Sequence, residues 1–296
     1  MTIATQAKIN LSLELLGRRP DGFHELATVF QAIDLADEIR LQPALALTVK
    51  VHGASVPGDE RNLCWRAAAL LATRSGRAPA VRIDLHKRVP VGGGLGGGSA
   101  NAAGVLAALA QMWQLGLSMA ELESLAAELG SDCAFFIRGG TALGGGRGEQ
   151  LEYLPTPSLA LVVVGPSRAV STGAVYGQVR GFRADAGAAS ARLAESLRAG
   201  AVPPTRDWLV NDLQAPATRV SPVLAAEQEV LAELCGDRFL LSGSGGSWFL
   251  VAGDAAEAAD WAGRLRSRWP RRLVAETRPV DYGWRVIDPR EESGDA

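Results

Sequence analysis

The sequence predicts an α+β protein of two domains, in which helices pack on mainly antiparallel sheets. Three observations support this prediction. Segments with strand periodicity alternate with helical segments along the 296 residues, and several of the strands have one polar face. The apolar content of 47% is sufficient for real hydrophobic cores. Two prolines in LEYLPTPS precede a new strand pattern, which places the domain boundary at about residue 157, between domains 1–156 and 157–296.

The first domain is expected to begin with a strand. Apolar and polar residues alternate from residue 9 to residue 15, which predicts a half-buried strand with Lys8, Asn10 and Ser12 on its polar face. Further strands are predicted over 45–51 and 81–86.

Two helices of the first domain have recognisable ends. The first, over 62–74, has Asn62 as its expected N-cap. The second, over 118–130, begins with a capping-box spacing at Ser118 and ends at Gly130, which suits the left-handed position after a last turn.

The second domain repeats the alternation of strands and helices. A strand is predicted over 159–164, directly after the boundary. Helices are predicted over 188–198, 221–234 and 255–269, and strands over 238–241, 248–251 and 273–277. The acidic segment from Arg290 is expected to be frayed.

Charge and composition exclude several classes of protein. The formal net charge is −2 and the chain has no basic tract, so no binding of nucleic acid is expected. No apolar run approaches the roughly 20 residues of a membrane span, and the start lacks the pattern of a signal peptide. Three cysteines and three histidines at wide spacing predict neither a disulfide framework nor a metal site. We expect a cytoplasmic protein without a membrane partner, present as a monomer or weak homodimer.

The segment PVGGGLGGGSANAAG, residues 90–104, holds six glycines within seven positions. Each glycine costs roughly 0.5–1 kcal/mol relative to alanine, so this density requires an explanation. A flexible linker is one interpretation, but the segment runs directly into a helix that Ser99 or Asn101 could cap.

Two phosphate-binding interpretations compete with the linker. The glycines fit the dinucleotide pattern G-x-G-x-x-G, but Pro90 intervenes after the strand and no acidic residue follows before Glu121. A Walker loop is excluded because no lysine follows the last glycine. A different phosphate cradle agrees better with the sequence, because bare backbone N–H groups and a helix N-terminus both favour a polyanion.

Four segments in order, between residues 7 and 249, resemble the motifs of the GHMP kinases. They are AKINLSLELLGRRPDGFHELATVFQAIDLAD, PVGGGLGGGSANAA, LGSDCAFFIRGGTALGGGRGE and LLSGSGGSWF. The doubled glycine triplet and DGFH are similar to one branch, whose small-molecule substrate carries a cytidylyl group. The resemblance implies a two-domain GHMP kinase fold, with an N-terminal domain like ribosomal protein S5 domain 2 and a ferredoxin-like C-terminal domain. It also implies phosphoryl transfer from ATP, assisted by Mg²⁺.

The resemblance implies that Asp132 accepts the proton of the substrate hydroxyl, with Lys8 beside it. A nearby ammonium would keep the Asp132 carboxylate ionised and stabilise the oxygen that reacts. Two ordinary solvated charges are the alternative.

The same resemblance implies the substrate-binding residues. Asn10 shares the strand face of Lys8 and could hydrogen-bond the substrate. Phe23, where the branch usually has tyrosine, would stack on the cytosine, and His24 would bind its polar edge. Tyr176 would lie on the opposite side of the base and Thr172 near a substrate phosphate.

A longer set of residues is expected to contact ATP, with Ser99 at the phosphates or their Mg²⁺ and no dedicated protein metal ligands. Members of the family often have a serine where this chain has Ala100, and a valine where it has Cys133. We expect Cys133 to pack in the core, since no histidine is near to activate its thiol. The expected ATP contacts are Asn62, Lys87, Pro90, Val91, Gly92, Gly93, Gly94, Leu95, Gly96, Gly97, Gly98, Ser99 and Ala100.

Several alternatives stay open. Lys87 could be an exposed charge at a strand end, and residues 242–246 could form either a second phosphate loop or a tight hairpin turn. Another GHMP kinase, acting on homoserine, mevalonate or a sugar, is the alternative enzyme. A nucleotide-dependent oxidoreductase and a non-catalytic nucleotide-binding module are the alternatives from other classes.

Overall fold

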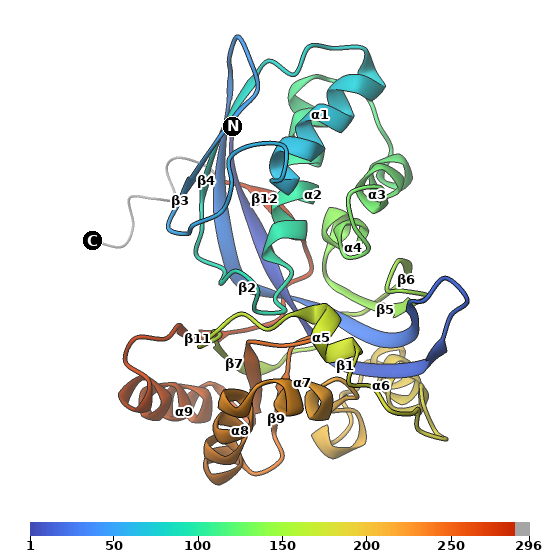
Figure 1. Cartoon of the computed structure of the whole chain (residues 1–296), viewed down its shortest axis with the longest axis vertical. Helices are drawn as coiled ribbons and strands as arrows, with labels where there is room; N and C mark the ends of the chain where they lie inside the picture. The colour runs from blue at the N-terminus through green and yellow to red at the C-terminus, as the bar shows by residue number, and fades with distance from the viewer. Residues whose placement is uncertain (288–296) are drawn as a thin grey trace.

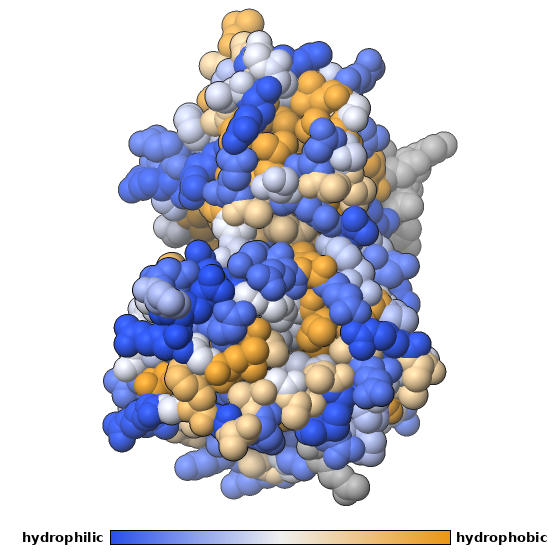
Figure 2. Space-filling model, turned by 90° about the vertical axis from the view of Figure 1, so that its right-hand side faces the viewer, coloured by the Kyte–Doolittle hydropathy of each residue, from blue (hydrophilic) through white to orange (hydrophobic). Residues whose placement is uncertain are grey.

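The structure, a computed structural model, describes residues 1–287, which form one sheet of eight strands and one of four. Figure 1 shows the larger sheet in the upper half and the smaller one in the lower half, each with helices packed against it. On the face drawn in Figure 2, a waist separates the two halves, and hydrophobic residues form separate patches among hydrophilic ones. None of the described helices is long and apolar enough to cross a membrane. The acidic segment from Arg290 lies outside the described residues.

Two long antiparallel strands, β1 (Thr2–Arg18) and β2 (His24–Pro43), form the centre of the larger sheet. The main path of the sheet is β12-β1-β2-β4-β3, while β5 pairs with β2 and β6, and β8 pairs with β1. Only β3–β4 and β1–β8 are parallel among the described strands, so the prediction of mainly antiparallel sheets is confirmed. The remaining strands are β3 (Thr48–His52), β4 (Val81–His86), β5 (Thr141–Gly145), β6 (Gln150–Leu154), β8 (Val210–Asn211) and β12 (Trp284–Val286).

Four helices cover the larger sheet and share one hydrophobic core with it. Asn62 caps the first helix by accepting a hydrogen bond from Cys64 N, and the capping box at Ser118 is present, so both predictions are confirmed. The prediction for Gly130 is wrong, because the third helix ends at Ala127 and the following residues turn directly into the next helix. The four are α1 (Leu63–Ser75), α2 (Gly97–Met112), α3 (Met119–Ala127) and α4 (Cys133–Arg138).

The smaller sheet is antiparallel, with the order β11-β7-β10-β9. Its strands are β7 (Ala160–Val164), β9 (Phe239–Leu241), β10 (Trp248–Ala252) and β11 (Val274–Thr277). The helices of this half are α5 (Thr172–Tyr176), α6 (Ala188–Arg198), α7 (Gln214–Val220), α8 (Pro222–Cys235) and α9 (Ala255–Arg268), with one 3₁₀ turn (Thr205–Asp207).

Strand β1 lies between the two halves and is buried on both faces. Its alternating apolar residues, Ile9 and Leu11 among them, pack against strands of the smaller sheet in a shared cluster. Its polar residues are also buried: Lys8, Asn10 and Ser12 expose 3%, 2% and 0% of their surface. The prediction of a half-buried strand is therefore wrong. The reason is that glycine-rich loops lie close against Lys8 and Asn10, whose side chains bond each other, while α6 covers Ser12 through a 2.8 Å contact between the Ser12 and Ser190 hydroxyls.

The division near residue 157 falls between the strands of the two sheets, since β6 ends at Leu154 and β7 begins at Ala160. Two later strands return to the larger sheet: β8 and β12 both pair with β1. We therefore propose a domain boundary near residue 157. In this division, β8 and β12 belong to the second domain by sequence but pair with β1 of the first domain.

Candidate active site

A pocket of about 820 Å³ lies where the two halves meet. Strands β1 and β2, the glycine-rich loop before α2, the start of α4, and α5 all contribute to its wall. The pocket gathers both predicted catalytic residues, the five predicted substrate-binding residues and two of the glycines. These are Lys8, Asp132, Asn10, Phe23, His24, Thr172, Tyr176, Gly94 and Gly96.

Lys8 and Asp132 lie next to each other at one end of this pocket, although they come from β1 and from the start of α4. Lys8 Nζ lies 3.8 Å from Asp132 Oδ2, and the side chains are 4% and 34% exposed. Burial lowers the pKa of Lys8 below its ordinary value, and the nearby carboxylate partly opposes this shift. Asp132 is the N-cap residue of α4 but makes no side-chain capping bond, so its carboxylate is available to a ligand.

A buried chain of hydrogen bonds holds the ammonium of Lys8. Lys8 Nζ donates to Asn10 Oδ1 at 2.6 Å, and Asn10 Nδ2 donates to Thr28 Oγ1 at 2.8 Å. Thr28 in turn donates to the carbonyl of Ser12 at 2.6 Å. Asn10 therefore positions Lys8, in addition to lining the pocket.

The first glycine-rich loop is interlocked with residues 242–247, the second glycine-rich loop. Ser247 N donates to Gly93 O, and Ser242 Oγ donates to Gly94 O, both at 3.0 Å. A Cβ on Gly94 would lie 2.0 Å from Ser242 O, and one on Gly93 would lie 2.4 Å from Ser247 Oγ. Packing between the two loops therefore requires glycine at these two positions.

The start of α2 differs from the expectation. The helix begins at Gly97, and Gly96 is its N-cap with φ 69°. The prediction that Ser99 or Asn101 caps the helix is wrong, because both lie inside it. The helix starts earlier because glycine alone readily adopts the left-handed backbone that turns the chain into it.

The first turn of α2 presents backbone N–H groups that have no partner within the helix, which favours an anion. Gly98 lies in this turn, and a Cβ there would meet only Leu63 Cδ1, at 3.7 Å. Neither packing nor a positive φ requires glycine at this position. Ala100, by contrast, is buried in the core that α2 shares with the larger sheet, so its side chain does not reach a ligand.

The apolar residues before and between the two glycine triplets differ in exposure. Val91 is 51% exposed, whereas Leu95 is only 1% exposed and accepts a hydrogen bond from Lys8 N through its carbonyl. Pro90 lies beside Gly165, where a Cβ would approach its ring at 3.1 Å. Leu95 therefore ties the loop to β1 through its backbone.

Lys87 and Asn62 do not line the pocket described above. The ammonium of Lys87 is buried in an ion pair with Asp37 and also donates to Asn101 Oδ1 at 3.1 Å. The alternative of an exposed charge is therefore wrong for Lys87. Asn62 is 5% exposed, and its side chain bonds Cys64 N and Pro57 O. Contact of either residue with adenine stays a prediction.

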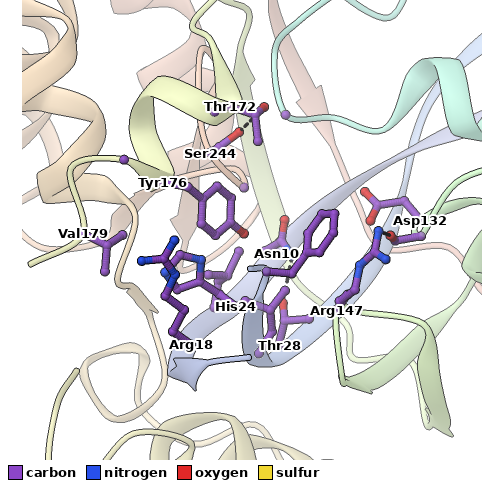
Figure 3. A pocket seen from close by; sticks show the side chains of 18 of the residues that line it. Asn10, Arg18, His24, Thr28, Asp132, Arg147, Thr172, Tyr176, Val179 and Ser244 are labelled. Carbon is purple, nitrogen blue, oxygen red and sulfur yellow. Dashed lines mark hydrogen bonds between the residues drawn. The ribbon is translucent and has the colours of Figure 1, made fainter. Parts of the chain in front are cut away.

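Aromatic residues gather at the other end of the pocket. The ring centroids of His24 and Tyr176 are 5.1 Å apart, and Phe23 is 50% exposed. Burial, with a contribution from Arg18, lowers the pKa of His24, and burial raises the pKa of Tyr176 to about 12. Figure 3 shows Tyr176 and His24 across the pocket from Asp132. Both rings are therefore neutral at pH 7.

The Thr172 hydroxyl is 2.8 Å from that of Ser244, which connects α5 to the second glycine-rich loop (Figure 3). A Cβ on Gly243 would lie 3.5 Å from Asn10 Oδ1. Asn211 Nδ2 holds the same loop by donating to the carbonyls of Leu241 and Gly243, each at 2.8 Å. The second glycine-rich loop therefore reaches the polar face of β1.

Sequence reasoning missed several residues of the site. Thr28 and Arg147 line the pocket, and Asn211 shapes it, but none of them belongs to a segment with a readable period. A signal existed for Thr28 and Arg147, because each stands in a segment that resembles a family motif, and Arg147 also lies between two glycines.

The three cysteines are buried free thiols. Burial raises the pKa of Cys133, next to Asp132, to about 11. A thiol of this pKa is not a nucleophile at neutral pH, in agreement with the predicted packing role. Among the described residues no group of three or more His, Cys, Asp or Glu side chains is arranged to hold a metal ion.

Comparisons with known proteins agree with this geometry. Residues 62–140 match the model of the GHMP kinases N terminal domain. A homoserine kinase from Cytophaga hutchinsonii has the same fold, with a TM-score of 0.75 at 18% identity over 97% of each chain. The fold and the site together define a GHMP kinase, and the predicted fold class is confirmed.

More similar relatives narrow the class. A crystal structure of 4-(cytidine 5'-diphospho)-2C-methyl-D-erythritol kinase has a TM-score of 0.78 at 36% identity, covering 95% of this chain and 100% of that one. The 4-diphosphocytidyl-2-C-methyl-D-erythritol kinase of Nocardia farcinica is 40% identical over 97% of this chain and 96% of its own length. That of Moorella thermoacetica is 42% identical over 94% and 99%. The chain belongs to the 4-diphosphocytidyl-2-C-methyl-D-erythritol kinase family.

Proposed function

We propose that this protein phosphorylates the 2-hydroxyl of 4-diphosphocytidyl-2-C-methyl-D-erythritol with ATP, a step in non-mevalonate isoprenoid precursor biosynthesis. The observation that carries the proposal is the distance of 3.8 Å between Lys8 Nζ and Asp132 Oδ2 in a pocket that also holds Phe23, His24 and Tyr176. A charged pair at one end suits an alcohol that reacts, and neutral aromatic rings at the other end suit a nucleobase.

Phosphoryl transfer depends on positioning and charge stabilisation more than on covalent chemistry by the protein. The substrate oxygen bonds to the γ-phosphorus, the bond from that phosphorus to the bridging oxygen breaks, and ADP leaves. The hydroxyl proton passes to the Asp132 carboxylate. Lys8, held by Asn10, stabilises negative charge on the oxygen atoms in transfer. No covalent enzyme intermediate is required.

The glycine-rich loop and the first turn of α2 would hold the phosphates of ATP. The open position at Gly98 and the free N–H groups of the helix start fit a polyanion. Ser99, in the first turn of α2, would contact these phosphates or their Mg²⁺, an ion that usually keeps several waters and binds substrate phosphates. The ion supplies neutralisation of phosphate charge when it is bound with the nucleotide.

The aromatic end of the pocket would bind the cytosine base of the substrate. Phe23 and Tyr176 offer ring faces for stacking on cytosine, and neutral His24 offers both a donor and an acceptor for its polar edge. Thr172, beside Ser244, would bind a substrate phosphate. We further propose that the protein acts in the cytoplasm as a monomer or weak homodimer.

A panel of alcohols tests the proposed reaction. The protein, labelled ATP and Mg²⁺ would be incubated separately with the cytidylyl substrate, homoserine, mevalonate and a hexose. We expect label transfer to the cytidylyl substrate alone. Transfer to homoserine, mevalonate or the hexose instead would assign the protein to another activity of the GHMP kinases.

The burial of Lys8 predicts an alkaline limit to activity. Burial lowers the pKa of Lys8 from its ordinary value of 10.5, so the ammonium loses its proton at a lower pH than a free lysine does. We expect kcat/KM to decline as the pH rises and this proton is lost. In the same window the unfolded chain binds more protons than the folded one, so the stability rises with pH while activity falls. A pH profile of kcat/KM measures this alkaline decline, which is the alkaline limb of the profile. Lys8→Arg should move it to higher pH, because arginine does not titrate in this range, and an unmoved limb would assign it to another group.

A further inference from the structure

Arg147 has a fixed backbone at the rim of the pocket. It lies in the turn between β5 and β6, where its N–H donates to Glu149 Oε2 at 2.6 Å. Leu26 N donates to the carbonyl of Gly146 at 2.8 Å, which ties the turn to β2 next to the aromatic end of the pocket. Gly146 and Gly148, on either side of Arg147, have positive φ values of 67° and 105°. The turn therefore presents this one long side chain to the pocket.

The guanidinium of Arg147 connects the two ends of the site. Its central carbon lies 3.8 Å from the centroid of the Phe23 ring, the distance of a stacked pair. Its Nη2 donates to Ser131 Oγ at 3.3 Å, one residue before Asp132. Figure 3 shows Arg147 on the Asp132 side of the pocket, across from Tyr176. One face of Phe23 is thus covered by Arg147, and only the other face is available to a base.

Among the described residues, the only carboxyl group on which the charge of Arg147 is seen to act is that of Asp21, whose pKa it helps to lower without forming an ion pair. Its neighbour Arg19 forms ion pairs with Asp21 and Glu25 at 3.1 and 2.6 Å. In the described part of the chain, no carboxylate forms an ion pair with the guanidinium of Arg147. Stacking uses the face of a guanidinium and leaves its edge N–H groups free, and these groups match the oxygen atoms of a phosphate in pairs.

We propose that Arg147 determines the specificity of this enzyme for a nucleoside diphosphate substrate. Its face supports Phe23 as the platform for the base, and its edge binds the diphosphate that joins the base end to the alcohol. The inference rests on the proposed function, because it assigns a residue to the diphosphate of that substrate. It makes Phe23 and Arg147 one recognition unit.

Steady-state kinetics of three variants test this role. Arg147→Met keeps the length of the side chain without charge, and we expect it to raise KM for the cytidylyl substrate by about 10-fold or more. KM for ATP should stay unchanged. Arg147→Lys keeps the charge but not the planar fork, so it should recover part of the loss. Arg77→Met, an exposed arginine after α1, is the matched control and should behave as wild type. Equal changes in both KM values would indicate a merely structural turn residue.

A binding experiment separates the diphosphate contact from the stacking contact. Calorimetry with CDP and with cytidine, in the presence of saturating ADP, gives the preference for the diphosphate. We expect wild type to prefer CDP, and Arg147→Met to lose most of this preference while still binding cytidine. An unchanged preference in the variant would overturn the inference alone. Failure of the wild type to bind either ligand would instead contradict the proposed function.

Discussion

Replacement of Asp132 by Asn should lower kcat by at least about 100-fold, a typical scale for the loss of a proton acceptor. The amide has nearly the shape of the carboxylate but cannot take the proton of the substrate hydroxyl. It also removes the negative partner 3.8 Å from Lys8 Nζ, which further lowers the pKa of that buried ammonium. Single-turnover and steady-state assays, together with ATP titration, measure the effect.

The binding of ATP and the fold should be nearly unchanged in this variant. The side chain of Asp132 makes no capping hydrogen bond to α4, so helix formation does not depend on its charge. Asp237→Asn, which alters an exposed carboxylate after α8, serves as the matched control. If Asp132→Asn kept near-normal turnover, Asp132 would not be the base.

Two alanine substitutions in the first glycine-rich loop should have opposite effects on stability. In Gly94→Ala the new Cβ would lie 2.0 Å from the backbone oxygen of Ser242, at a residue with φ 75°. The left-handed conformation alone costs about 1–2 kcal/mol, and forced overpacking costs about 1–3 kcal/mol. Because no side-chain rotation relieves a backbone clash, the loops must separate. We expect a loss of roughly 3 kcal/mol in the free energy of unfolding, measured in urea, and little residual activity.

Gly98→Ala, in the first turn of α2, should stabilise the fold but weaken the binding of ATP, unlike Gly94→Ala. Its Cβ meets only Leu63 Cδ1 at 3.7 Å, so the fold accepts it, and the helix should gain up to about 1 kcal/mol. The added methyl group would nevertheless stand among the N–H groups proposed to hold the phosphates, so KM for ATP should rise about 10-fold or more. A stabilised protein with unchanged KM for ATP would place the phosphates elsewhere.

Local signals in the sequence predicted those elements whose ends depend on local chemistry. The cap at Asn62, the strand over 81–86 and the helix over 188–198 were all predictable, because caps and single-face periodicity are set by nearby residues. Strand β2 was not, although it spans 20 residues. Residues 28–33 of β2 are buried one after another, and its pairing with β1 has three register shifts, so no period of two extends along β2.

The residues of the site likewise fall into those that local motifs predict and those whose contacts depend on the fold. Lys8, Asp132 and the glycines could be proposed because they stand in ordered motifs. The environment of Lys87 could not, because its partner Asp37 is 50 residues away and meets it only through pairing in the folded sheet. The stacking of Arg147 on Phe23 likewise joins a turn of the β5–β6 hairpin to a segment more than a hundred residues earlier. Such contacts depend on topology, which the local pattern does not encode.

The return of β12 to the edge of β1 has a consequence for synthesis of the chain. Gln6 N donates to Gly283 O at 2.9 Å, and Thr5 pairs with Trp284, so β1 obtains this neighbour from residues that are translated long after it. While the ribosome is still elongating, that edge of β1 has no protein partner and can recruit other nascent chains. Chaperones that shield exposed strand edges should therefore matter most for this protein in the interval before β12 is translated.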